Sequence, residues 1–211
     1  MYNDKKIILA DDHSVVRRGV ALIIKDALPG VTVMHAESFT ELLVLLEKQQ
    51  TDIVILDINL PGGNTPNMIE QARALQPSLK ILIFSAFDEE QYAPRYLHSG
   101  ADGYLNKLAS EESIIEAIKT ILDGGRYIST KVKEILLENS LNKTPHNPLE
   151  ILSNREMEIV ALLAKGEGNL EIANKLNIQM STVSTYKNRI FEKLRVNNVV
   201  SLVEKYKLYS S

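Results

Sequence analysis

Polar side chains follow four short apolar segments of this 211-residue chain, at the point where each segment ends. They are Asp11 and Asp12 after residues 6–10, Asp57 after 53–56, Ser85 after 81–84 and Lys107 shortly after 103–105. Short runs rich in β-branched residues are typical of strands that are covered on both faces, as in a parallel sheet. Because the carboxyl ends of parallel strands open on one edge, where α/β proteins bind ligands, we expect these side chains to meet there.

Three carboxylates, a hydroxyl and an ammonium at one edge could carry out phosphoryl transfer. Carboxylates that lie close together repel one another unless a cation sits among them, and oxygen ligands suit Mg²⁺. Asp57 would then act as a nucleophile toward phosphorus and form an aspartyl phosphate. Mg²⁺ and Lys107 would neutralise charge on the equatorial oxygens, and Ser85 would donate a hydrogen bond to one of them. The histidines are scattered along the sequence, and none is assigned as a ligand: His13, His35, His98 and His146.

The elements that must position these side chains alternate between strand and helix patterns. The expected strands are residues 6–10, 31–36, 53–56, 81–84 and 103–105, and the expected helices begin near Ser14, Ser38, Pro66, Asp88 and Ser110. Ser14 and Ser110 are expected helix caps, and Ser38 with Glu41 forms a capping-box pattern. Five rounds of strand then helix predict an α/β fold with a doubly wound, five-stranded parallel sheet over residues 1–125.

The strand-end residues resemble those of the receiver domain of bacterial two-component response regulators, and five positions agree in type, order and placement: Asp11, Asp12, Asp57, Ser85 and Lys107. The resemblance covers about the first three-fifths of the chain. It implies a flavodoxin-like sheet with strand order 2-1-3-4-5 and Asp57 as the phosphoacceptor. It also implies that Asp11 and Asp12 bind the metal ion with the backbone carbonyl of Asn59, and that Tyr104 is the switch aromatic.

The chain changes character after residue 125. Residues 126–148 are interpreted as a linker with a short helix at 131–138, because the stretch 139–147 is polar and contains a proline. Residues 149–211 then form a second domain, with helical patterns that run over about 153–165, 170–176, 181–194 and 199–207. Ser153 with Glu156 forms a capping-box pattern at the start of the first of these helices. A short helix, a tight turn and a longer helix with basic and hydroxyl residues outward predict a helix-turn-helix in a small all-α, four-helix domain.

This second part resembles the LuxR/NarL-type DNA-binding domain over roughly residues 149–205. The matching segments are Leu152-Ser153-Asn154-Arg155-Glu156, Glu171-Ile172-Ala173, Leu176, Thr182-Val183 and Lys193-Leu194. The resemblance implies that the helix over residues 181–194 enters the major groove of double-stranded promoter DNA. The candidate DNA contacts on this helix are Thr182, Ser184, Thr185, Lys187, Asn188, Arg189 and Lys193.

Composition agrees with two small globular domains. The apolar fraction of 45% is enough for real cores, and the absence of Cys excludes disulfides and thiolate metal sites. The sequence shows no signal-peptide pattern and no run long enough to span a membrane, so we expect a cytoplasmic protein. Residues 1–128 contain 12 Lys/Arg and 18 Asp/Glu, a net charge of −6, whereas residues 151–211 contain 9 and 6, a net charge of +3. A basic second domain agrees with nucleic-acid binding, although this charge is also ordinary for a solvated surface.

Together these features predict a DNA-binding response regulator rather than an enzyme. A sensor histidine kinase would phosphorylate Asp57, Tyr104 would repack, and the second domain would bind paired DNA half-sites as a homodimer, with RNA polymerase as a further partner. One alternative is a phosphohydrolase with Asp57 as nucleophile, but this enzyme would need an acid/base carboxylate where Asn59 stands. Another alternative is a pseudo-receiver that acts through protein contacts without phosphorylation.

Overall fold

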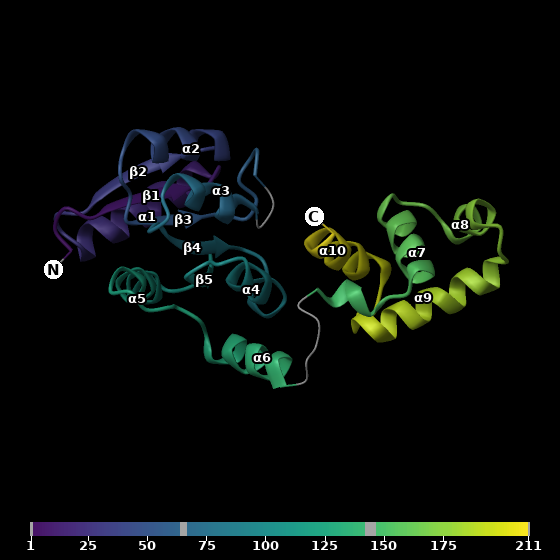
Figure 1. The fold of residues 1–211 in the computed structure, drawn as a ribbon. Helices are drawn as coiled ribbons and strands as arrows, with labels where there is room; N and C mark the ends of the chain where they lie inside the picture. Colours follow the sequence, from purple (N-terminus) through teal and green to yellow (C-terminus); the bar gives the residue numbers. More distant parts are fainter. Residues whose placement is uncertain (1, 64–66, 142–146, 211) are drawn as a thin grey trace. The chain divides into compact units, whose positions relative to one another are not determined.

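Five strands form one parallel sheet in the order β2-β1-β3-β4-β5 (Figure 1). Their bounds are β1 Lys6–Ala10, β2 Thr32–Ala36, β3 Ile53–Leu56, β4 Lys80–Ser85 and β5 Gly103–Asn106. The structure is a computed structural model that describes residues 2–63, 67–141 and 147–210. The strand order and the parallel pairing confirm the predicted doubly wound sheet.

Five helices alternate with these strands along the chain: α1 Ser14–Ala27, α2 Phe39–Lys48, α3 Asn67–Leu75, α4 Glu89–His98 and α5 Glu111–Leu122. Ser38 and Ser110 cap α2 and α5 as predicted, since each side chain accepts a backbone N–H three residues ahead. The expected cap at Ser14 is wrong. Ser14 is the first residue of α1, and His13 at the N-cap position makes no capping side-chain bond. The expected helix start at Pro66 lies outside the described residues.

Alternation along the strands sends side chains to both faces of the sheet. One face packs with α1 and α5 in a core that includes Ile7, Leu9, Ile24, Ile53, Leu82 and Ile118. The intervening strand residues point to the other face and are also completely buried, for example Ile8 and Val54. All four residues of β3 are buried, which explains its uninterrupted apolar run. The polar residue that follows, Asp57, therefore comes directly at the end of a rigid, fully covered strand.

The second part of the chain is entirely helical within the residues described there. It contains a 3₁₀ helix, η1, and four α-helices: η1 Pro148–Ile151, α7 Asn154–Ala164, α8 Asn169–Leu176, α9 Met180–Leu194 and α10 Val199–Tyr209. The predicted capping box at the start of α7 is present, with Ser153 and Glu156 each accepting a hydrogen bond from the other's backbone. Asn177 adopts a left-handed conformation (φ 51°) in the turn between α8 and α9. These helices enclose a core of their own that includes Leu149, Ile159, Ile172, Val183, Ile190 and Leu202.

The chain divides into two compact units, Met1–Glu138 and Asn139–Ser211. A helix, α6 (Thr130–Leu141), lies in the segment predicted as a linker with a short helix. Its first turn belongs to the first unit, where Val132 is completely buried and Lys131 forms an ion pair with Glu90 of α4. Part of the predicted linker, residues 142–146, lies outside the described residues. The domain boundaries at 125 and 148 stay predictions.

Candidate functional site

The carboxyl ends of the strands bring buried charges of both signs to one edge of the sheet. The Asp57 N–H donates to the carbonyl of Ala10 at 2.8 Å, which aligns the end of β3 with the end of β1. Lys107 Nζ lies 2.8 Å from Asp57 Oδ2 and 2.7 Å from Asp11 Oδ2. Asp11 and Asp57 are only 5% and 3% exposed. The ammonium of Lys107 therefore bridges two buried carboxylates from neighbouring strands.

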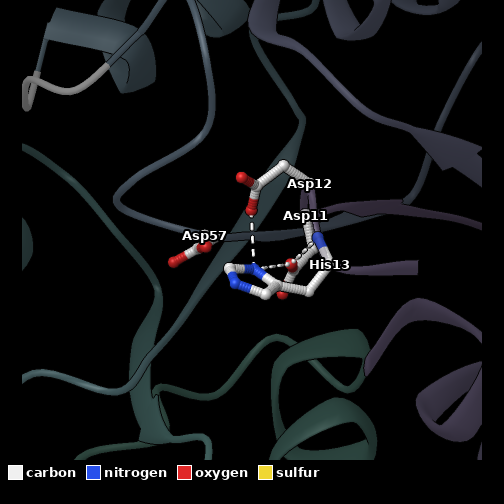
Figure 2. Close-up of side chains that lie close together, drawn as sticks. All are labelled: Asp11, Asp12, His13 and Asp57. Carbon is white, nitrogen blue, oxygen red and sulfur yellow. Dashed lines mark hydrogen bonds and ion pairs between the residues drawn. The ribbon is translucent and has the colours of Figure 1, made fainter. Parts of the chain in front are cut away.

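His13 also belongs to this group, although it was not expected there from the sequence. Its ring Nδ1 lies 2.7 Å from Asp12 Oδ1 and 3.2 Å from Asp11 Oδ1 (Figure 2). One ligand atom from each of Asp11, Asp12, His13 and Asp57 can be chosen so that all four lie within 4.8 Å of one another. His13 directly follows the acidic pair in the sequence, and this adjacency could have indicated its position. The prediction that the histidines are scattered overlooked this adjacency.

Lys107 is the principal counter-charge of this edge. Burial alone would lower the pKa of Lys107, but hydrogen bonds to Asp11 and Asp57 outweigh burial, and the pKa is raised. The side chain therefore remains an ammonium at neutral pH. The group holds three carboxylates, and the Lys107 ammonium contacts two of them, so an excess of negative charge favours a further cation.

The donor set fits Mg²⁺. Carboxylate oxygens from Asp11, Asp12 and Asp57 are hard ligands, and Mg²⁺ typically takes one or two carboxylates and keeps several waters. The His13 imidazole is better suited to transition metals, and its contacts are to Asp11 and Asp12. Asn59 stands two residues after Asp57 and is exposed. The role of its carbonyl as a ligand stays a prediction.

Ser85 and Tyr104 meet at the turn that follows β4. Ser85 is the last residue of β4, and its Oγ accepts the backbone N–H of Phe87 at 3.3 Å. The Tyr104 ring is buried, and its hydroxyl donates to the Phe87 carbonyl at 3.1 Å. Burial raises the pKa of Tyr104, whereas a hydrogen bond with Ser85 acts in the opposite direction. In this arrangement the predicted switch aromatic is inside the protein and tied to the turn beyond Ser85.

Arg17 supports the same edge from α1. It is only 6% exposed, and its guanidinium donates to the backbone carbonyl of Asp11 and to the carboxylate of Glu37. These contacts hold the turn that carries Asp11 and Asp12 against the first turns of α1. No pattern in the sequence indicates this role, because an Arg near the start of a helix is usually solvated.

In the second unit, α9 carries an exposed polar face. Its hydroxyl, aromatic and basic side chains line an open hollow formed by Ser181, Thr182, Thr185, Tyr186 and Arg189. Asn188 is exposed beside them. Ser184 instead turns toward α8, where it accepts a hydrogen bond from Asn169 Nδ2 at 3.2 Å. Lys187 also approaches Asn169, with 3.5 Å between Nζ and Oδ1. Of the predicted contacts, Thr182, Thr185, Asn188 and Arg189 share this face.

Lys193 differs from the other candidate DNA contacts, because it is paired with a buried acid. Its Nζ lies 2.7 Å from Glu156 Oε2 and 3.4 Å from the carbonyl of Ile151. The Glu156 side chain is 4% exposed, whereas that of Lys193 is 41% exposed. Burial would raise the pKa of Glu156, but hydrogen bonds from Lys193 and Ser153 prevail and lower it. Lys193 thus ties the end of α9 to the capping box of α7.

Comparison with known families identifies both units. Residues 7–119 match the response regulator receiver domain, and residues 150–206 match the bacterial regulatory proteins of the luxR family. The chain therefore belongs to the DNA-binding response regulators that join a receiver domain to a LuxR-type helix-turn-helix domain. None of the helices in the described ranges has the length and apolar character needed to cross a membrane.

Among its relatives is the oxygen regulatory protein NreC of Staphylococcus carnosus (strain TM300), 36% identical over 207 residues, which cover 94% of this chain and 95% of that one. Among solved structures, RcsB from Salmonella enterica serovar Typhimurium, bound to a promoter in the presence of the phosphomimetic BeF3-, matches with a TM-score of 0.79 and 26% identity. The match covers 97% of this chain and 98% of RcsB. The response regulator ChrA of a heme-sensing two-component system matches with a TM-score of 0.52 and 29% identity, over 96% of each chain.

Proposed function

We propose that Asp57 accepts a phosphoryl group from a sensor histidine kinase and that this modification controls DNA binding by the second unit. The observation that carries the proposal is the buried Asp57 carboxylate, held 2.8 Å from the Lys107 ammonium at the end of β3. An oxygen of Asp57 attacks phosphorus, a bond forms between them, and the bond from phosphorus to the donor histidine breaks. Lys107 is placed to offset the charge of the transferred group.

Asp11, Asp12 and Asp57 would hold Mg²⁺ at this edge, with the backbone carbonyl of Asn59 as a further ligand. When bound, the ion neutralises charge on the phosphoryl oxygens. Other residues of the chain position the carboxylates. Arg17 fixes the turn that carries Asp11 and Asp12, and Lys107 keeps two carboxylates close together that would otherwise repel each other.

Ser85 and Tyr104 would pass the modification on. The added negative charge draws the Ser85 hydroxyl toward the phosphoryl oxygens, and Tyr104 packs into the space beside it. The buried Tyr104 ring and its hydrogen bond to the Phe87 carbonyl support this role. Phosphorylation then shifts the population between two arrangements of the turn after β4 and of α4, rather than creating a new one.

The second unit would bind promoter DNA as a homodimer on paired half-sites, and it would act on RNA polymerase in the cytoplasm. The front of α9 reads base edges in the major groove through Thr182, Thr185 and Asn188, while Lys187 and Arg189 contact phosphates. The predicted contact at Ser184 would first have to release its hydrogen bond from Asn169. The DNA complexes formed by the related RcsB support this proposal. The predicted contact at Lys193 is the weakest of the set, because its charge is already paired with Glu156.

The direct test is intact-mass analysis of the full chain after incubation with acetyl phosphate and Mg²⁺. The wild-type chain should gain one phosphoryl group, and Asp57→Asn should gain none. Asp52→Asn is the matched control, because Asp52 precedes β3 at its opposite end, and this variant should be modified like the wild type. Modification of Asp57→Asn would show that the phosphoacceptor is elsewhere. An unmodified wild type would favour a receiver that acts without phosphorylation.

A further inference from the structure

Asn106, the last residue of β5, connects the two turns that flank the phosphorylation edge. Its Nδ2 donates to the carbonyl of Phe87 at 3.2 Å, in the turn after β4. Its Oδ1 accepts the backbone N–H of Leu108 at 2.8 Å, in the turn after β5. One side-chain amide therefore bridges the segment next to Ser85 and the segment that carries Lys107.

The Phe87 carbonyl is the point where these contacts converge. It accepts from Asn106 Nδ2 and also from the Tyr104 hydroxyl, and a carbonyl oxygen has two lone pairs that can serve both donors. Tyr104 and Asn106 are two residues apart on β5, so their side chains leave the strand on the same face. The Phe87 N–H in turn donates a hydrogen bond to Ser85 Oγ. The Phe87 ring stacks on the ring of Tyr92 in α4, with centroids 4.6 Å apart.

The orientation of the Asn106 amide follows from its partners. A backbone N–H can only donate, so the atom that faces Leu108 must be the oxygen. The nitrogen then faces the Phe87 carbonyl, which can only accept. Both ends of the amide are satisfied in this orientation, and a flipped amide would oppose like groups at both ends.

We propose that Asn106 is a positioning residue that couples the turn after Ser85 to the turn that carries Lys107 and stabilises the arrangement in which Tyr104 is buried. This inference rests on the proposed phosphoacceptor function of the site. It adds that the responses of Ser85 and Lys107 to a phosphoryl group are linked through one side chain. The Tyr104 hydroxyl also donates to the Phe87 carbonyl, whereas Asn106 in addition accepts the Leu108 N–H of the turn after β5.

Two variants separate the two halves of the bridge. Asn106→Ala removes both hydrogen bonds. Asn106→Asp keeps an oxygen for the Leu108 N–H and places the other carboxylate oxygen against the Phe87 carbonyl, so it breaks only the contact to the turn after β4. Tyr104→Phe is the matched control, because it removes the other donor to the Phe87 carbonyl and leaves Asn106 in place.

The first measurement is hydrogen–deuterium exchange of the full chain, which needs no ligand. We expect Asn106→Ala to speed exchange about 2- to 10-fold both in the peptide over 85–88 and in the peptide over 107–109, the range for loss of one ordinary hydrogen bond. Asn106→Asp should affect mainly 85–88. If Asn106→Ala changes only 107–109, Asn106 does not couple the two turns and the inference is wrong.

The second measurement is the rise in thermal midpoint on titration with beryllofluoride and Mg²⁺. Asn106→Ala and Asn106→Asp should each need about 2- to 10-fold more beryllofluoride for the half-maximal rise, because the arrangement that favours the mimic is less populated. An unchanged half-maximal concentration, with a lower midpoint in the absence of beryllofluoride, would reduce Asn106 to a structural role. A wild type that fails to respond would count against the proposed function, while the exchange data would still decide whether Asn106 links the turns.

Discussion

Replacement of Lys193 by Met should lower the unfolding free energy of the second unit without removing a DNA phosphate contact. The variant keeps the aliphatic stem of the side chain and leaves the Glu156 carboxylate, 4% exposed, without its ammonium partner, so that its remaining hydrogen bonds come from Ser153. Loss of one partner of a buried pair costs about 3–5 kcal/mol. Lys193 itself is 41% exposed, so solvent screens the pair and we expect about 2 kcal/mol. For a domain of this size, that loss lowers the thermal midpoint by roughly 10 °C.

The assay combines thermal unfolding with the salt dependence of DNA affinity, both on the full chain. A lysine that neutralises a phosphate contributes about one unit to the slope of log affinity against log salt concentration. Lys193→Met should leave this slope unchanged while lowering the midpoint of the second unit. Lys187→Met is the matched control on the same helix, and it should reduce the slope by about one unit with little effect on the midpoint.

A double replacement sharpens the test. Removal of both charges, in Lys193→Met with Glu156→Gln, should recover part of the lost stability, because no unpaired carboxylate is then buried. A different result would be that Lys193→Met reduces the salt slope as much as Lys187→Met does and leaves the midpoint unchanged. Lys193 would then be a phosphate contact, and its pairing with Glu156 would be incidental.

Three further predictions concern acidity, the bridging ammonium and the turn before α9. Because the folded-state pKa of Glu156 is depressed below its ordinary value of 4.5, its contribution to the unfolding free energy is complete above that pH and is lost as pH falls through the lower pKa. Denaturant titrations across the acid range should show this loss in the wild type and a flatter dependence in Glu156→Gln. Lys107→Met leaves Asp11 and Asp57 facing each other without an ammonium, so calorimetric titration should show tighter Mg²⁺ binding. Phosphorylation of this variant by acetyl phosphate should be slower than that of the wild type. An unchanged Mg²⁺ affinity would contradict the bridging role of Lys107. Asn177→Ala should lower the unfolding free energy of the second unit by about 1 kcal/mol, since φ is 51° there, whereas Asn177→Gly should be close to neutral in the same chemical denaturation.

Much of the fold could be predicted from local patterns. The apolar runs that end in a carboxylate or hydroxyl mark the sheet because both faces are covered, and the strand order follows from the resemblance to receivers. Ser38, Ser110 and Ser153 act as the predicted caps because a cap needs only its own turn. The prediction of a cap at Ser14 is wrong because α1 begins one residue earlier than expected, and His13 occupies the capping position.

The contacts that escaped prediction join elements far apart in the sequence. The pairing of Lys193 with Glu156 spans 37 residues, and the contact between Asn106 and Phe87 spans 19. Neither has a periodic signal, because a side chain's partner depends on how helices and turns pack. Arg17 is similar, because its partner Glu37 follows β2 and stands 20 residues away in the sequence. His13 is the exception, since its place beside the acidic pair was visible in the sequence.

We propose that the acidic edge of the sheet controls DNA binding through Asp57. The most direct measurement is genome-wide footprinting with the full chain, with and without acetyl phosphate and Mg²⁺, for the wild type and for Asp57→Asn. We expect acetyl phosphate to add or strengthen protected sites for the wild type and to change nothing for Asp57→Asn. Equal protection with and without the phosphodonor in the wild type, or an equal response in Asp57→Asn, would contradict it.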